Sequence, residues 1–304
     1  MKAIQSFRSE DIRPALESFG GPALLKTRIQ VMALSAASIA QHYDSFEFIT
    51  DDAGAAMAEA CAFPYTKITS IGPAFNSSKR FWVHSKFEAY KSKEPFLHFD
   101  NDLFLWEPLP ARVHQADVVS LHGESFGWPI YESWLQSADK IKGMPRLQDK
   151  YYYNRTPMNM AIFGGNDTVA ISKYAEYVLA FVDSLNGLRD LDAVEAEAIK
   201  PLMPVFEQLW GSYLLQCEYG KRPEFILTER EIHQQLDNPE VKLTHMQDAK
   251  LKLAQDPKKL METIQKIAHK LKAINPKVYA AVAEFTSTSL ETPFEEPEHV
   301  TLIA

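Results

Sequence analysis

Two carboxylates follow an apolar run in the segment Phe96–Trp106, which reads FLHFDNDLFLW. The run predicts a buried strand, and Asp100 and Asp102 come directly after it. Residues two apart in an extended chain point the same way, so a slight turn at Asn101 lets both carboxylates face one cation. Mg²⁺ and Mn²⁺ favour sites of one or two carboxylates completed by phosphate oxygens and water. The segment therefore predicts a divalent-metal site for a phosphorylated ligand, with a pair of capping loop aspartates as the alternative.

Alternating apolar runs and helical segments precede these carboxylates. The alternation is typical of an α/β protein with a mostly parallel, doubly wound sheet. Ligands of such sheets bind at the carboxyl ends of the strands, where Asp100 and Asp102 lie. The predicted strands cover 2–7, 46–50, 66–71 and 96–99, and the predicted helices cover 27–43, 55–62 and 80–91.

The chain after the carboxylates continues the α/β pattern and then becomes helical. We expect a catalytic domain over 1–250, a helical appendage packed on it over 251–285, and a loose acidic tail over 286–304. The predicted elements are strands over 117–121 and 158–163 with an aromatic-rich insertion at 126–153 between them, helices over 172–185 and 204–216, and a lysine-rich helical segment over 256–284.

Composition excludes several classes of protein. A net charge of −8 argues against nucleic acid as the main partner, because phosphate binding needs a basic surface. Cys61 and Cys217 lie far apart without metal-ligand spacing, which predicts buried thiols in a reducing compartment. No run has the length of a signal peptide or a membrane span. We therefore expect a cytoplasmic protein.

A fourth strand that ends in Asp-x-Asp, after a helix bearing Lys86, resembles the GT-A glycosyltransferases, especially the glycogenin-like and bacterial lipopolysaccharide sugar transferases. The resemblance spans much of 1–250 and implies a GT-A, Rossmann-like α/β fold. It implies that Asp100 contacts sugar or ribose as well as metal and that Asp102 binds the metal directly, with Asn101 beside the donor. It also implies that Lys86 contacts the donor, and a solvated helix lysine is the alternative.

The same resemblance assigns roles to the late segment Val241–Lys250, which reads VKLTHMQDAK. Glycogenin-like enzymes complete their metal site with a late histidine, which implies that His245 is the third ligand. One imidazole nitrogen and two carboxylates form a set compatible with Mn²⁺. A lysine follows that histidine in these enzymes and holds the diphosphate, which implies that Lys250 offsets charge on the departing nucleoside diphosphate.

Two further segments resemble sugar-facing parts of these enzymes. Asn159 begins NMAIFGGN, where donor and acceptor groups bind, although Ala161 stands where glycine is common. Gly164 and Gly165 permit close backbone approach to a sugar, and a tight turn is the alternative.

The pair Glu207-Gln208 is similar to an acidic residue followed by glutamine that faces the sugar. Glu207 can act as general base or steady positive charge on the sugar ring. A helix-surface Glu207, with Gln208 packed beside Trp210, is the alternative. This sequence has Glu where the family often has Asp.

Polar and aromatic residues at the first two strand ends are positioned to reach a nucleotide. Phe7 can stack on the base and Ser6 can bond through its hydroxyl. Asp51 and its neighbour Asp52 can reach the base or ribose, or they can cap the helix that follows.

The combined hypothesis is a metal-dependent hexosyltransferase that moves a sugar from a nucleoside diphosphate sugar to a glycan or lipid-linked hydroxyl in surface-glycan synthesis. The first candidate donor is a UDP-sugar. The resemblance favours retention of configuration. Two alternatives stay open: a haloacid-dehalogenase-like Mg²⁺ phosphatase with Asp100 as nucleophile, and a non-catalytic nucleotide-sugar-binding protein. Three βα units before Asp100, and Leu103-Phe104 after Asp102, argue against the phosphatase.

The lysine-rich segment 250–277 is open to two interpretations. It forms an amphipathic helix that closes the core with its lysines in solvent, or it contacts the inner face of an anionic membrane.

Overall fold

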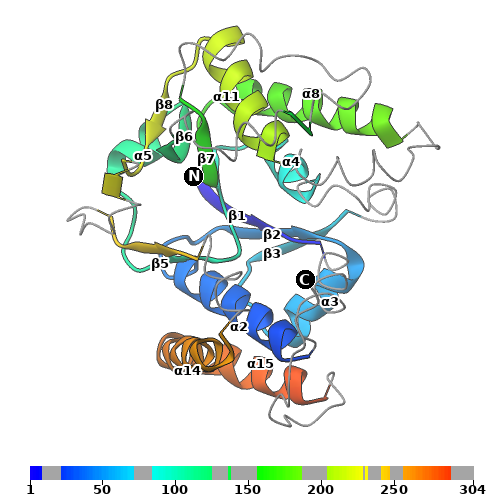
Figure 1. Cartoon of the computed structure of the whole chain (residues 1–304), viewed down its shortest axis with the longest axis vertical. Coiled ribbons are helices and arrows are strands. Elements are labelled where there is room, and N and C mark those ends of the chain that lie inside the picture. Colours follow the sequence, from blue (N-terminus) through cyan, green and yellow to red (C-terminus); the bar gives the residue numbers. More distant parts are fainter. Residues whose placement is uncertain are drawn as a thin grey trace. The chain divides into compact units, whose positions relative to one another are not determined.

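The computed structural model describes residues 1–8, 22–71, 84–124, 136–137, 156–186, 204–228, 230–231, 241–246 and 256–288. They belong to two compact units. Unit 1 comprises Met1–Ser6, Ile71–Asp100 and Glu107–Lys242, and unit 2 comprises Phe7–Ser70, Asn101–Trp106 and Leu243–Ala304. Helices and strands alternate in both units, and each unit contains parallel strand pairs, so the predicted α/β class is confirmed (Figure 1).

Unit 1 is built on five strands. β1 pairs in parallel with β4, β6 pairs in parallel with β8, and β7 runs antiparallel to both β4 and β6. The carboxyl ends of β1, β4 and β6 therefore share one sheet edge with the amino end of β7. In spatial order the strands are β1 (Lys2–Ser6), β4 (Phe96–Phe99), β7 (Met158–Gly165), β6 (Val118–Gly123) and β8 (Pro223–Phe225).

The ladder between β6 and β7 contains an irregularity near that edge. Ser120 pairs with Phe163 and His122 pairs with Asn159, so β7 has more residues than β6 between these two pairs. Such a bulge bends a strand and re-aims its side chains, and bulges are common beside active sites. The carbonyl of Ala161, inside the bulge, accepts a hydrogen bond of 2.8 Å from the Asp100 amide.

Helices of unit 1 pack around an aromatic core. The Tyr90 ring contacts the rings of Phe96, Phe163 and Tyr174 at centroid distances between 4.7 and 6.3 Å. Aromatic pairs of this kind contribute about 0.5–1.5 kcal/mol each beyond the area they bury. The helices are α4 (His84–Tyr90), α5 (Ala111–Gln115), α8 (Thr168–Asn186), and a continuous helical stretch made of η3 (Val205–Trp210), α11 (Gly211–Tyr213) and η4 (Leu214–Glu218), in which η3 and η4 are π-helical.

The described residues of unit 2 form two short pairs of strands and four helices. β2 (Phe46–Thr50) and β3 (Lys67–Ser70) are parallel, and β5 (Leu103–Leu105) and β9 (Leu243–His245) are antiparallel. The helices are α2 (Pro22–Ile39), α3 (Asp52–Ala60), α14 (Pro257–Ile274) and α15 (Pro276–Thr288), and α14 lies beside α2 (Figure 1).

Helix α2 fixes β5 by hydrogen bonds at both ends. The Ser35 hydroxyl donates to the carbonyl of Leu103 at 2.6 Å, and the amide of Leu105 donates to the Ser38 hydroxyl at 3.1 Å. All four residues are buried. The strand that follows Asp102 is therefore held to a helix as well as to β9.

Two of the differences from the sequence-based expectation have a clear physical reason. The helical segment predicted over 256–284 is two helices, because Pro276 disfavours helical geometry at Asn275 and lacks an amide hydrogen. The apolar run after Asp102 forms β5, a strand that the sequence did not predict because its partner β9 lies far along the chain.

Gly165 closes β7 where no side chain fits. Its φ is 139°, and a Cβ built there lies 2.1 Å from the carbonyl oxygen of Asp117. We expect Gly165→Ala to lower the free energy of unfolding by about 3 kcal/mol or more, from the glycine-only backbone and from overpacking. Gly220 (φ +65°) has open space around its Cβ position, so Gly220→Ala should cost only about 1 kcal/mol. Urea unfolding of both variants tests this, and equal losses would contradict it.

Candidate functional site

Three metal-ligating side chains converge at the carboxyl end of β4. One carboxylate oxygen of Asp100, one of Asp102 and one ring nitrogen of His245 all lie within 4.8 Å of one another. The His245 Nε2 atom lies 3.7 Å from Asp102 Oδ1, which is too long for a hydrogen bond. The structure thus brings together the three residues predicted as metal ligands.

Backbone hydrogen bonds hold the two aspartates in place. The Asp100 carbonyl accepts from Gln5 Nε2 at 3.3 Å, in addition to the bond from its amide to Ala161. The Asp102 carbonyl accepts from the Met246 amide at 3.1 Å. The antiparallel register pairs Leu103 with His245, which places the histidine beside Asp102.

This donor set fits a divalent cation. Two opposite ligands of Mg²⁺ lie about 4 Å apart, so three donors within 4.8 Å need little movement to share one ion. Two carboxylates and one imidazole suit Mn²⁺ or Mg²⁺, with positions left for phosphate oxygens and water. Asp102 is buried, whereas Asp100 and His245 are half-buried, so the group is accessible from one side.

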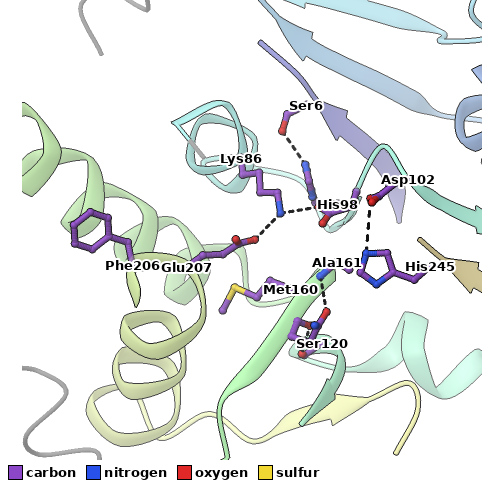
Figure 2. Close-up of polar contacts among 12 residues, drawn as sticks. Ser6, Lys86, His98, Asp102, Ser120, Met160, Ala161, Phe206, Glu207 and His245 are labelled. Atoms are coloured by element: carbon purple, nitrogen blue, oxygen red, sulfur yellow. Dashed lines mark hydrogen bonds and ion pairs between the residues drawn. The ribbon is translucent and has the colours of Figure 1, made fainter. Parts of the chain in front are cut away.

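Lys86 links Asp100 to Glu207. Its Nζ atom lies 2.6 Å from Asp100 Oδ1 and 2.6 Å from Glu207 Oε1. Figure 2 shows the Lys86 ammonium pointing toward the Glu207 carboxylate. Lys86 lies on α4 and Glu207 on η3, and both are buried. The alternative that Lys86 is a solvated helix lysine is therefore wrong, and its ammonium is part of the candidate site.

The charges of this cluster depend on one another. Burial alone would lower the Lys86 pKa, but the Asp100 and Glu207 carboxylates outweigh that effect and raise it. Burial raises the Glu207 pKa, Lys86 opposes the rise, and the negative charge of Asp100 adds to it. Lys86 is therefore the shared counter-ion of the buried Glu207 carboxylate and the half-buried Asp100 carboxylate.

The segment that carries Glu207 is held by Tyr174. The Tyr174 hydroxyl donates to the carbonyls of Phe206 and Glu207 at 3.1 and 2.8 Å. A Cβ on Gly211 would lie 2.9 Å from the same hydroxyl oxygen, so glycine there permits the approach. Burial raises the Tyr174 pKa well above its usual value, so the hydroxyl keeps its proton and donates. π-Helical turns like η3 occur often at functional sites.

Ser6 is paired with a buried histidine. The Ser6 hydroxyl lies 2.9 Å from His98 Nε2. Burial, followed by the positive charge of Lys86, lowers the His98 pKa well below its usual value. The imidazole is therefore neutral at pH 7, and the pair fixes the Ser6 side chain at the end of β1.

Asn159 lies at the same sheet edge, next to a second buried carboxylate. Its side-chain amide donates to Glu124 Oε1 at 2.6 Å, and its side-chain oxygen accepts from the Ala161 amide at 3.1 Å. Glu124 directly follows β6, as Asp100 follows β4. The negative charge of Glu124 contributes to the raised pKa of Glu207, which indicates that these side chains are neighbours.

Other predicted site residues lie elsewhere. Gly164 and Gly165 pair with Leu97 and Phe96 at the opposite end of β4 from Asp100, where they permit close packing of backbones. Phe7 is 5% exposed in the core of unit 2, with the Arg28 guanidinium 5.8 Å from its ring centroid.

Asp51 is the N-cap of α3. It accepts from the Gly54 amide at 2.7 Å, as the capping alternative anticipated. Asn101 and Gln208 are half-buried, and Lys250 lies outside the described residues.

Sequence reasoning missed His98, Glu124 and Tyr174. His98 and Glu124 carried a usable signal, because each is a polar residue in or directly after an apolar strand. Tyr174 carried none, since a tyrosine on the apolar side of a helix resembles an ordinary core residue.

The fold and the site define an α/β protein with a candidate divalent-metal centre at the end of β4. The chain belongs to DUF6734, a family of unknown function, whose model matches residues 1–285. A comparison with curated proteins gives no match. Among the helices in the described part of the chain, none combines the length and the apolar composition needed to cross a membrane.

One solved structure similar to this chain is the crystal structure of the glycosyltransferase GlyE in Streptococcus pneumoniae TIGR4. The TM-score is 0.42 and the sequence identity is 9%. The match covers 96% of this chain and 65% of the GlyE chain, which is just under two thirds of that protein.

Proposed function

We propose that the protein is a metal-dependent glycosyltransferase that moves a hexose from a nucleoside diphosphate sugar to a hydroxyl acceptor. The first candidate donor is a UDP-sugar. The observation that carries the proposal is the convergence of Asp100, Asp102 and His245 at the carboxyl end of β4. Ligands of open α/β sheets bind at that end of the strands. A cation held by two carboxylates and one imidazole keeps positions for the oxygens of a diphosphate.

Asp100, Asp102 and His245 would hold Mn²⁺ or Mg²⁺. The bound cation supplies charge neutralisation for the departing nucleoside diphosphate. The three side chains orient the diphosphate relative to Glu207, because Asp100 and Glu207 share the Lys86 ammonium. We assign Lys250 to the same diphosphate, as its second positive neighbour.

Glu207 is the carboxylate that we place beside the reacting sugar. Its second oxygen can stabilise positive charge on the sugar ring or accept the proton of the acceptor hydroxyl. Lys86 opposes the rise of the Glu207 pKa and so favours the ionised form that either role needs, and Gln208 follows Glu207 on η3. We propose retention of configuration at the anomeric carbon, which NMR analysis of the product anomer would test.

Nucleotide recognition falls to the ends of β1 and β2 in this proposal. Ser6, oriented by His98, is the last residue of β1, and Asp51 follows β2. Phe7 is buried in the core of unit 2, so we do not assign it to the base. Asn101, between the two candidate ligand aspartates, contacts the donor. Polar strand ends of this kind suit a ribose.

Asn159 and its partner Glu124 provide polar groups for sugar hydroxyls. Both are buried at the edge that carries Asp100 and Glu207. Gly164 and Gly165, which we had assigned to the sugar, belong to the packing of β7 instead. We propose that the acceptor is a glycan or lipid-linked hydroxyl used in surface-glycan synthesis in the cytoplasm.

The test is release of nucleoside diphosphate from a panel of UDP- and GDP-sugars, with Mn²⁺, with Mg²⁺ or with EDTA. We expect slow hydrolysis of one donor that requires the metal and accelerates when the correct acceptor is added. Glu207→Gln should lower turnover about 10²-fold or more while donor binding changes little.

Other outcomes of the panel decide between the alternatives. Donor binding by calorimetry without turnover under any metal condition would favour a nucleotide-sugar-binding protein. Hydrolysis of an aryl phosphate, with Asp100 trapped as an aspartyl-phosphate, would overturn the transferase in favour of a phosphatase.

A further inference from the structure

Helix α14 presents a lysine-rich face to solvent. Its apolar side, including Ile264, Ile267 and Leu271, is buried in unit 2, where α14 packs on α2. The apolar side of α14 is therefore covered and cannot insert into a membrane or a partner. The exposed basic residues of α14 and the start of α15 are Lys258, Lys259, Lys266, His269, Lys270, Lys272 and Lys277.

This surface is positive although the protein is acidic. It has six exposed lysines, whereas the same two helices and the N-cap of α14 carry three exposed acidic residues, which are Asp256, Glu262 and Glu284. The whole chain has a net charge of −8. The negative charge of the rest of the protein already makes it soluble, so solubility does not account for a separate positive surface. Positive charge that is concentrated on one surface of an acidic protein instead favours binding to an anionic partner.

Aromatic and apolar groups are interleaved with these lysines. The Lys270 ammonium lies 5.6 Å from the centroid of the Trp106 ring, and the Lys272 ammonium lies 5.7 Å from that of Tyr279. Both rings are partly buried, and Met261 is 38% exposed on α14. Lysines beside tryptophan, tyrosine and methionine are the composition that protein surfaces use at the boundary between lipid headgroups and acyl chains.

We propose that the α14 lysine surface docks the protein reversibly on an anionic lipid membrane. A row of charges on a convex helix suits a flat sheet of phosphates, whereas nucleic acid would have to approach a protein that is acidic elsewhere. Each lysine near such a membrane strengthens binding, and the negative charge of Glu262 partly offsets this effect. Because the apolar face of α14 is covered, the binding is electrostatic and strongly reduced by salt.

The surface adjoins the segment that carries Asp102. Trp106 follows Asp102 by four residues, and those residues span about 13 Å when extended. A membrane-bound acceptor would then lie near the candidate metal group, and this consequence rests on the proposed transferase function. The docking itself requires no turnover.

The test is co-sedimentation with phosphatidylcholine vesicles that contain or lack phosphatidylglycerol, at low and high salt. We expect binding to the anionic vesicles at low salt and none to the neutral vesicles. The double variant Lys258→Glu/Lys266→Glu should bind at least about tenfold more weakly. Lys93→Glu/Lys173→Glu changes the net charge equally at exposed positions of unit 1 and should bind like the wild type.

Equal weakening by both double variants would overturn the proposal, because net charge alone would then govern binding. Failure of the wild type to bind anionic vesicles at low salt would overturn it as well. Tighter binding to a short DNA duplex than to the vesicles would show that the partner of this surface is nucleic acid and not a membrane. Nucleotide release by both variants without vesicles should match the wild type, so failure here is distinguishable from failure of the transferase function.

Discussion

Asp102→Asn is expected to remove metal-dependent turnover, with a loss of about 10³-fold, because the amide keeps the shape of the side chain but supplies no negative charge. The same change should weaken Mn²⁺ binding, measured by loss of the free Mn²⁺ signal in electron paramagnetic resonance. Asp102 is buried beside His245 and faces Asp100, so its charge has no substitute within the group.

Thermal unfolding separates this loss from misfolding. In EDTA, Asp102→Asn should unfold at or above the temperature of the wild type, since two carboxylates that repel each other have become one. Saturating Mn²⁺ should stabilise the wild type by about 2.7 kcal/mol at 100 times Kd, and the variant far less. Asp183→Asn is the matched control, an identical change on the exposed side of α8. Full activity of Asp102→Asn would show that Asp102 is not part of the active site.

Lys86→Met is expected to destabilise the protein by about 3–5 kcal/mol at neutral pH, because the buried Glu207 carboxylate and the half-buried Asp100 carboxylate lose their counter-ion. Methionine fills similar space, so the loss reports charge rather than a cavity. The double variant Lys86→Met/Glu207→Gln should recover much of it. Urea unfolding in EDTA measures all three proteins.

The destabilisation should depend on pH with a defined sign. The Glu207 pKa is raised in the folded protein by burial, and losing Lys86 raises it further. Above pH 4.5 the folded variant therefore binds more protons than the unfolded chain, and its stability falls as pH rises. The deficit of Lys86→Met relative to wild type should be larger at pH 8 than at pH 5. A deficit that is independent of pH would show that Lys86 contributes packing and not charge.

The strand pattern and the Asp100–Asp102 pair were predictable because both depend on local sequence. Apolar runs at 2–7, 46–50 and 96–99 correspond to β1, β2 and β4, and a polar residue directly follows each run. Asp100 and Asp102 needed no distant partner to be recognised. His245 was inferred from resemblance, and the β5–β9 pairing now accounts for its position.

Features that depend on distant partners escaped prediction. Lys86 looks like a solvated lysine on an amphipathic helix until Glu207, over a hundred residues later, packs against it. The periodicity of 204–216 predicts a helix but does not distinguish π-helical from α-helical turns, which Tyr174 and Gly211 help to set. Gly164 and Gly165 fit a sugar loop equally well in sequence, and only the register of β7 assigns them to backbone packing.

The short β5–β9 ladder makes completion of the metal group a late event in the life of the chain. His245 is synthesised about 140 residues after Asp102, which takes on the order of 10–30 s at the usual rates of translation. Strands β1, β4, β6 and β7 are complete at Gly165, about 80 residues before His245. A nascent chain thus exposes two carboxylates without their imidazole partner, and full cation affinity arises only after about four fifths of the chain has been made.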